Sequence, residues 1–167
     1  NAMPLVITER DGVRLYHSVF FARADSGIET LDDLGGRSIA FQRRNSTSAY
    51  FAPAAALLAA GHRLEILLSP LDRPEAPMVG YLFARSELNV STWVHKRLVD
   101  AGVLSNLDWD NPGRMPPAFR KDMKVLFETD QYPRALELVR SDLDPRVQAR
   151  LRELLLHAAD DPDAGEA

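Results

Sequence analysis

The chain has 167 residues, of which 46% are hydrophobic and 26% charged, and its formal net charge is −4. These values are typical of one globular domain, or of one lobe and part of another in a two-lobed protein. The acidic balance argues against general nucleic-acid binding, which needs a basic surface, and the absence of cysteine excludes thiol catalysis, disulfides and thiolate metal sites.

The chain begins with three residues, Asn1 to Met3, that resemble a tag remnant and are set aside from the fold; residues 1–15 are interpreted as a lead-in. No signal peptide follows, and no apolar run approaches the length of a membrane span. The first predicted strand lies within residues 14–23. Its continuous apolar stretch, Val19-Phe20-Phe21, indicates a strand covered on both faces.

Helices and strands alternate along the rest of the chain, which predicts an α/β fold. Thr30 is expected to cap a short helix, with Asp33 three residues later and Gly35-Gly36 as its end. A helix is expected over residues 48–60, where Pro53 marks either a late start or an unpaired carbonyl. Further short strands are predicted at residues 38–41, 64–68, 79–84, 99–104, 124–127 and 135–139.

Two more helices are predicted from their apolar faces. The first follows residue 84 and carries Val90, Trp93, Val94 and Leu98 on one face. The last helix is capped by Asp144, has Pro145 at its first position, and has an apolar face. That face consists of Val147, Leu151, Leu154, Leu155 and Ala158.

The segment with the clearest chemistry joins a short strand to a helix, and its sequence is Phe41-Gln42-Arg43-Arg44-Asn45-Ser46-Thr47-Ser48-Ala49-Tyr50. Three consecutive hydroxyl residues stand where the first N–H groups of the helix have no intrahelical acceptor. Hydroxyls beside free amides form a cradle for an oxyanion, to which the two arginines could add charge. The simpler alternative is that Ser46 or Thr47 is an ordinary N-cap and the arginines are solvated.

At this loop the chain resembles the phosphonate-binding proteins of ABC transporters, which carry an Asn-Ser-Thr-Ser-Gly-Tyr-like loop after an Ala-Phe strand. Here alanine replaces the glycine. The resemblance extends from about Pro4 to Pro162 and includes four further motifs in the same order. They are Tyr16-His17-Ser18-Val19, Asp25-Ser26-Gly27-Ile28, Leu31-Asp32-Asp33-Leu34-Gly35-Gly36 and Val99-Asp100-Ala101-Gly102-Val103.

The resemblance implies a type II periplasmic-binding-protein lobe, with a mixed or parallel sheet flanked by helices. Residues 16–123 would form the ligand-binding lobe, and residues 124–167 a return segment with a hinge strand and the C-terminal helix. Tyr16–Ala22 and Arg134–Arg140 would be the two hinge strands. Half of the first lobe would be missing, so that the chain would be a truncated form of the two-lobed protein, either by design or by nature.

Carried over to this sequence, the resemblance implies that Ser46, Thr47 and Ser48, within the loop that starts at Asn45, bind the oxyanion, and that Tyr16 lines the cleft. Three positions depart from the family. Ser86-Glu87-Leu88 replaces a Ser-His-Asp motif, Asp108 is only the nearest match to a carboxylate that meets a ligand amine, and Tyr132-Pro133-Arg134-Ala135 lacks an acidic residue. Trp109 could stack on a ligand or pack under the proline-rich loop at 111–117.

Catalytic and metal sites are not expected. His17, His62, His95 and His157 have no metal-ligand spacing. The sequence has no Gly-x-Ser-x-Gly elbow, no Walker loop and no dinucleotide glycine pattern, so neither catalytic residues nor a cofactor are predicted.

The resulting hypothesis is a solute-binding component for a phosphonate or phosphate-like oxyanion, periplasmic in its parent protein and partnered by an ABC transporter permease. The alternative is a ligand-sensing or degenerate relative with altered or lost specificity. A homodimer is also expected, because the apolar face of the last helix and the strand edges near Val19 and Leu138 would lack partners.

Overall fold

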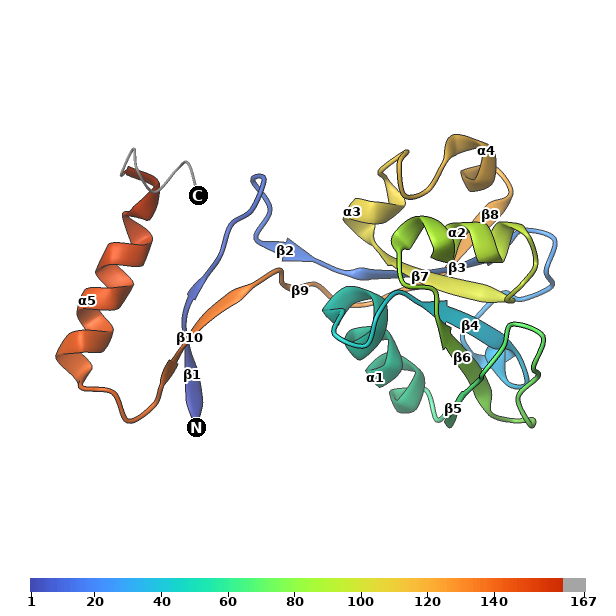
Figure 1. Cartoon of the computed structure of the whole chain (residues 1–167), viewed down its shortest axis with the longest axis horizontal. Helices are drawn as coiled ribbons and strands as arrows, with labels where there is room; N and C mark the ends of the chain where they lie inside the picture. The colour runs from blue at the N-terminus through green and yellow to red at the C-terminus, as the bar shows by residue number, and fades with distance from the viewer. Residues whose placement is uncertain (161–167) are drawn as a thin grey trace. The chain divides into compact units, whose positions relative to one another are not determined.

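A computed structural model describes residues 1–160, which divide into two compact units. The larger unit is Tyr16–Gln131, and the smaller one combines Asn1–Leu15 with the segment that starts at Tyr132 (Figure 1). Residues 124–131, expected to belong to the return segment, are instead part of the larger unit.

The larger unit contains a six-stranded sheet with the order β5-β6-β4-β7-β3-β8. The four strands from β5 to β7 in this order are parallel, whereas β3 runs antiparallel to both β7 and β8. The result is the expected mixed, mostly parallel sheet. The bounds are β3 Ser18–Arg23, β4 Ser38–Phe41, β5 Leu64–Ile66, β6 Val79–Phe83, β7 Ala101–Ser105 and β8 Met123–Glu128.

Helices flank this sheet (Figure 1). They are η1 Asp32–Leu34, the π-helical turn η2 Thr47–Phe51, α1 Ala52–Ala59, α2 Glu87–His95, α3 Asn106–Trp109 and α4 Pro117–Arg120. Pro53 lies in the first turn of α1, so the late start is the correct alternative for this proline.

The core of the larger unit consists of two clusters, and β3 contributes to both. Val19 and Phe21 belong to the cluster that includes Val90 and Val94 of α2, and Phe20 belongs to the other. All three β3 residues are fully buried, which confirms the strand covered on both faces.

In the smaller unit, a strand near the start of the chain pairs with a strand from its last third. Strand β1 (Ala2–Ile7) lies antiparallel to β10 (Leu136–Arg140), with Ala2 opposite Arg140 and Met3 opposite Val139. The first three residues therefore contribute to the fold, contrary to the expectation from sequence, because Ala2 and Met3 form part of this ladder. A second, two-residue ladder joins β2 (Leu15–Tyr16) to β9 (Tyr132–Pro133).

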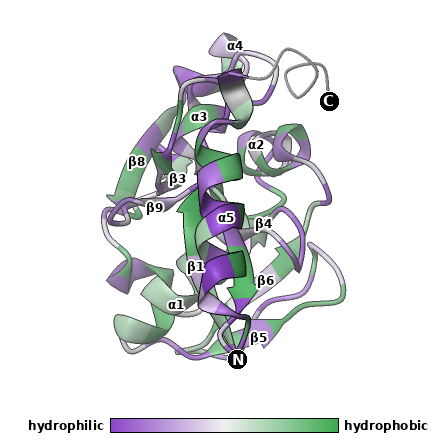
Figure 2. Ribbon diagram, turned by 90° about the vertical axis from the view of Figure 1, so that its left-hand side faces the viewer, coloured by the Kyte–Doolittle hydropathy of each residue, from purple (hydrophilic) through white to green (hydrophobic). Residues whose placement is uncertain are grey.

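Helix α5 (Pro145–Leu156) begins as predicted: the Asp144 carboxylate accepts from the N–H of Arg146 at 2.8 Å, and Pro145 opens the helix. A short turn, η3 (Ala158–Asp160), follows it. None of the residues of α5 is buried. Figure 2, in which α5 faces the viewer, shows apolar and polar residues along the helix.

Several local predictions need correction. Thr30 is not a helix cap, because the N-cap of η1 is Leu31 and the Thr30 hydroxyl donates to the Asp33 carboxylate at 3.2 Å instead of accepting from the helix. Leu98 lies beyond the end of α2 and is 40% exposed, so it is not on the buried face of that helix.

The expected hinge strands also differ from the structure. Strand β3 is an interior strand of the larger unit's sheet, flanked by β7 and β8, so Val19 is not at an open edge. Strand β10 belongs to the smaller unit, where it pairs with β1. The chain passes between the units at Leu15/Tyr16 and at Gln131/Tyr132, next to the short strands β2 and β9.

Candidate functional site

The hydroxyl loop lies between β4 and the helical turn η2, as its sequence predicts. Ser46 is the N-cap of η2, and its Oγ accepts from the N–H of Ala49 at 3.1 Å. The backbone fixes the loop further, because the N–H of Ser46 donates to the Arg43 carbonyl and the N–H of Gln42 donates to the Ala49 carbonyl. The loop is therefore a preformed structure whose cap is already in place.

The loop side chains differ in their exposure. Asn45 and Thr47 are exposed and Ser46 is half-buried, but Ser48 is only 7% exposed. The carbonyl of Ser48 accepts from the hydroxyl of Ser18 at 2.7 Å, which links the loop to the start of β3. The structure thus brings the three hydroxyl residues together, with Thr47 and Ser46 the more accessible ones.

Two further helix N-termini lie at the same edge of the sheet. Parallel strands end at one edge, where α/β proteins commonly bind ligands, and β6, β4 and β7 are neighbours in that order. Ser86 after β6 accepts from the N–H of Asn89 at 3.2 Å, and Ser105 at the end of β7 accepts from the N–H of Asp108 at 3.0 Å. Three serine-capped helices therefore begin at adjacent strand ends.

Sequence reasoning missed Ser86 and Ser105 as caps. A signal was present, since each serine is a preferred N-cap residue at the end of a predicted strand: Ser105 directly follows one, and Ser86 follows another after a single residue. Together with Ser46, these two caps define what we call the carboxyl edge: the ends of β6, β4 and β7 with the helix starts that follow them.

Glu87, which stands where the resemblance noted in the sequence implies a histidine, is not a free carboxylate. One of its oxygens accepts from the Gln42 side chain at 2.5 Å, and the other lies 3.6 Å from a guanidinium nitrogen of Arg114. Its side chain is only 19% exposed. These partners compensate part of the negative charge. Gln42 also connects two elements, because its side chain donates to Glu87 of α2 and its N–H donates to the Ala49 carbonyl at the end of the hydroxyl loop.

Positive charge surrounds the hydroxyl loop. The guanidinium of Arg43 donates to the Arg85 carbonyl at 2.8 Å, and Arg44 lies over the ring of Phe83 at 5.6 Å. Within residues 1–160, neither these two arginines nor Arg85 forms an ion pair with a carboxylate. Their charge is therefore available to an anion.

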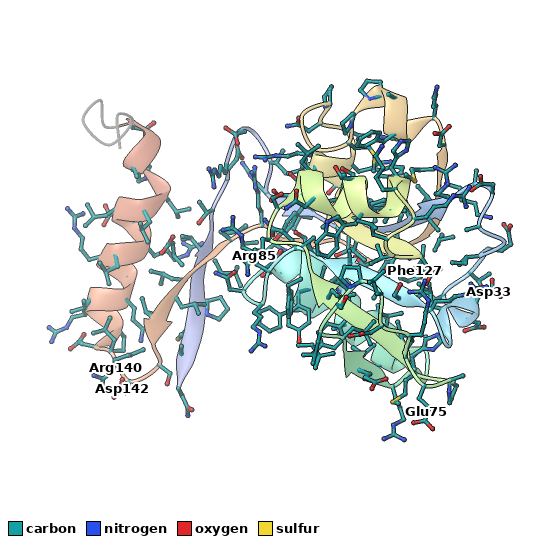
Figure 3. The ribbon with its side chains drawn as sticks, turned by 45° about the vertical axis from the view of Figure 1, so that its right-hand side comes forward. Asp33, Glu75, Arg85, Phe127, Arg140 and Asp142 are labelled. Atoms are coloured by element: carbon teal, nitrogen blue, oxygen red, sulfur yellow. The ribbon has the colours of Figure 1, made fainter. Side chains whose placement is uncertain are left out.

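Arg85 also has an unusual backbone. Its φ of 71° lies in the left-handed region that most side chains avoid, and such strain is often found at functional sites. Figure 3 shows Arg85 and Asp33 at opposite ends of the larger unit. The pKa of Asp33 is lowered, first by the backbone N–H of Glu29 and then by that of Thr30, which are local features away from the carboxyl edge.

The remaining predicted site residues have different surroundings. Asp108 accepts from the Ser105 hydroxyl at 2.6 Å, so it lies at the carboxyl edge. Tyr16 is half-buried and leads into β3, whose first residue pairs with Ser105. Trp109 is only 6% exposed, packs on the Phe21 ring and shares a core cluster with Met115 of the loop at 111–117, as expected if it packs under that loop.

In the part of the chain that the structure describes, no group of three or more His, Asp or Glu side chains is arranged to hold a metal ion. No helix among residues 1–160 is both long and apolar enough to cross a membrane.

Known proteins share this architecture. XAC2383 from Xanthomonas citri is 47% identical in its structures bound to ATP and to chloride ion, with TM-scores of 0.89 and 0.88. Each match covers 99% of this chain, which spans only 60% and 59% of the two matched chains. PhnD1 from Prochlorococcus marinus in complex with methylphosphonate is 20% identical, with a TM-score of 0.62 over 98% of this chain and 61% of that one.

These neighbours confirm the type II periplasmic-binding fold. The family model for the phosphonate periplasmic substrate-binding protein of ABC transporters matches residues 1–167. The chain therefore belongs to the family of phosphonate-type periplasmic substrate-binding proteins of ABC transporters.

Proposed function

We propose that the chain binds a phosphate- or phosphonate-bearing anion at the carboxyl edge of its larger unit. The main observation behind this proposal is that three serine-capped helices begin at the ends of the neighbouring strands β6, β4 and β7. Arg43, Arg44 and Arg85 lie in the segments that follow β4 and β6. Helix N-termini offer N–H donors and partial positive charge to an oxyanion, and guanidinium groups add charged hydrogen bonds.

Within this site, Thr47 and Ser46 would donate their hydroxyls and Ser48 its backbone N–H, with Asn45 at the loop entrance. Tyr16 and Asp108 would contact the part of the ligand that bears no phosphorus. The role is binding and not catalysis, since a cradle of helix amides and hydroxyls holds an oxyanion without a nucleophile and its base.

The ligand class extends from phosphate and phosphonates to phosphate esters. The support for esters is XAC2383, which binds ATP and is 47% identical to this chain. In the parent protein, such a receptor would act in the periplasm and deliver its ligand to a transporter permease. The alternative is a sensor with altered ligand specificity, which is favoured by Glu87 with its partners Gln42 and Arg114 at the position of the family's histidine.

Isothermal titration calorimetry with phosphate, methylphosphonate and ATP tests the anion site. We expect Thr47→Ala and Arg43→Gln to weaken binding of each ligand that the wild type binds, because a hydrogen bond to a charged group contributes about 1.5–3 kcal/mol. The control is Arg63→Gln, which changes an exposed arginine before β5, at the other edge of the sheet. Equal affinities in all variants would exclude the site.

Binding should be weak, with a dissociation constant in the micromolar range or above. A two-lobed receptor encloses its ligand, and this chain carries only part of that enclosure. Losing two or three charged hydrogen bonds weakens binding by roughly a thousandfold or more. Submicromolar binding of phosphate or methylphosphonate would contradict this expectation.

We also propose a homodimer through α5. Val147, Leu151, Leu154 and Leu155 are 45%, 37%, 52% and 42% exposed, at a spacing that places them on one face. A second copy that packs the same face against it would bury this apolar surface by twofold symmetry. Light scattering at micromolar concentration should give a dimer that Leu154→Glu converts to a monomer. A monomeric wild type would refute the proposal.

A further inference from the structure

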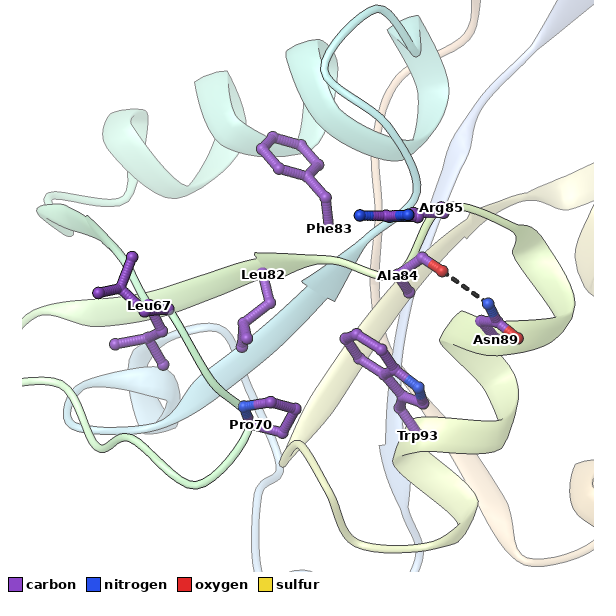
Figure 4. A pocket seen from close by; sticks show the side chains of 9 residues that line it. Leu67, Pro70, Leu82, Phe83, Ala84, Arg85, Asn89 and Trp93 are labelled. Atoms are coloured by element: carbon purple, nitrogen blue, oxygen red, sulfur yellow. Dashed lines mark hydrogen bonds between the residues drawn. The ribbon is translucent and has the colours of Figure 1, made fainter.

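A cavity of about 380 Å³ lies beside the ends of β5 and β6, within the larger unit (Figure 4). Its walls come from the loop after β5, the end of β6 and the first turns of α2. The lining residues are Leu67, Leu68, Pro70, Leu82, Phe83, Ala84, Arg85, Asn89 and Trp93. The volume is in the lower part of the range of roughly 300–1,000 Å³ that small-molecule sites occupy.

The cavity adjoins the carboxyl edge through two residues of its wall. The N–H of Ala84 donates to the Phe41 carbonyl and the N–H of Arg85 donates to the Gln42 carbonyl, both at 2.8 Å. The wall at the end of β6 is therefore bonded directly to the strand end from which the hydroxyl loop starts. The cavity and the hydroxyl loop are therefore next to the same two strand ends, those of β4 and β6.

The lining combines a flat ring, aliphatic side chains and a few polar groups. The indole of Trp93 is partly buried and packs against the core, which fixes its position. Asn89 donates to the Ala84 carbonyl at 2.8 Å, as Figure 4 shows, so its amide is held in one orientation with its oxygen still able to accept. Arg85 adds a guanidinium without a carboxylate partner among the described residues.

We propose that this cavity is a second subsite, which takes a planar heteroaromatic group attached to the anion that binds at the hydroxyl loop. The proposal rests on the proposed function, because the anion at the loop brings the group to the cavity. The Trp93 indole stacks on the ring, Leu67 and Leu82 cover its edge, and Asn89 and Arg85 bond its polar atoms. The ligand class is a nucleotide or a similar aryl-bearing phosphate ester.

The test compares ATP with inorganic tripolyphosphate, which carries the phosphates without the ring, by calorimetry on the full chain. We expect Trp93→Leu to weaken ATP binding roughly tenfold, the size of effect that loss of a ring stacked on a base produces. Tripolyphosphate affinity should not change. Leu68→Ser, at a side chain that is 93% exposed and so cannot unfold the chain, should weaken ATP binding by about twofold to fivefold.

Leu58→Ala is the control, since Leu58 is an exposed apolar residue of α1 outside the cavity. If both cavity variants bind ATP as the wild type does while both ligands still bind, the subsite is excluded and the anion site stands. If the wild type binds phosphate or methylphosphonate but not ATP, the subsite fails and the proposed function stands. If it binds none of these ligands, the proposed function fails and the subsite fails with it. Thermal melting of each variant separates loss of binding from loss of fold.

Discussion

The substitution Gly102→Ala tests how closely α2 packs on the sheet. A methyl group at this position of β7 would lie 2.8 Å from Val90 Cγ1 and 2.9 Å from both Phe21 Cζ and Val94 Cγ2. All three neighbours are fully buried, so none can move into solvent. Overpacking of a close-packed core costs about 1–3 kcal/mol, and we expect the free energy of unfolding to fall by that amount.

Urea denaturation followed by tryptophan fluorescence measures this change. Both tryptophans of the chain, Trp93 and Trp109, lie in the larger unit and belong to or pack against the cluster that contains Val90. Gly113→Ala is the matched control, because the added methyl group meets only the Asn111 side chain, at 3.2 Å in an exposed turn. It should change stability by less than about 0.5 kcal/mol. If Gly102→Ala is as stable as the control, α2 does not pack on β7 as described.

Three further substitutions test other features. Ser46→Ala removes the cap bond to the N–H of Ala49 and should lower the free energy of unfolding by about 1 kcal/mol in urea denaturation, and Ser46→Asp should restore most of it. Equal stability of Ser46→Ala and wild type would refute the cap. Glu87→Gln removes a negative charge at the carboxyl edge and should tighten phosphate binding by roughly twofold to tenfold in calorimetry, whereas unchanged affinity would show that the carboxylate does not face the ligand. Hydrogen bonding to Arg23 lowers the pKa of Asp25 to about 2, so the Asp25 carboxylate stabilises the fold above pH 4 and this contribution is lost as the pH falls toward 2. An NMR titration that gives Asp25 an ordinary pKa, or a pH profile of stability that Asp25→Asn leaves unchanged, would contradict this.

Local chemistry accounts for the parts of the fold and site that could be predicted. The run Val19-Phe20-Phe21 needs only its composition to indicate burial on both faces, and the structure assigns alternate residues to the two core clusters. Ser46 and Asp144 cap helices because the donors they satisfy lie within three residues of them. Such features depend on short stretches of sequence and so are visible in it.

Features that depend on distant residues could not be predicted. Glu87 is compensated by Gln42 and Arg114, which are far from it in sequence and meet it only in the folded sheet. The burial of Trp109 likewise depends on Phe21. Asn1 to Met3 resemble a tag remnant, and nothing near them in sequence indicates a strand, since the partner of Met3 is the distant Val139.

The ladder between β1 and β10 has a consequence for the order of folding. Ala2 pairs with Arg140, so nearly the whole chain forms the loop that this pairing must close, and the entropic cost of closure grows with loop length. Reciprocal backbone and side-chain hydrogen bonds between Ser18 and Thr129 hold the two ends of the larger unit's chain together once its sheet has formed. Formation of that sheet therefore shortens the effective loop, and the ladder at the chain ends should assemble last and open first.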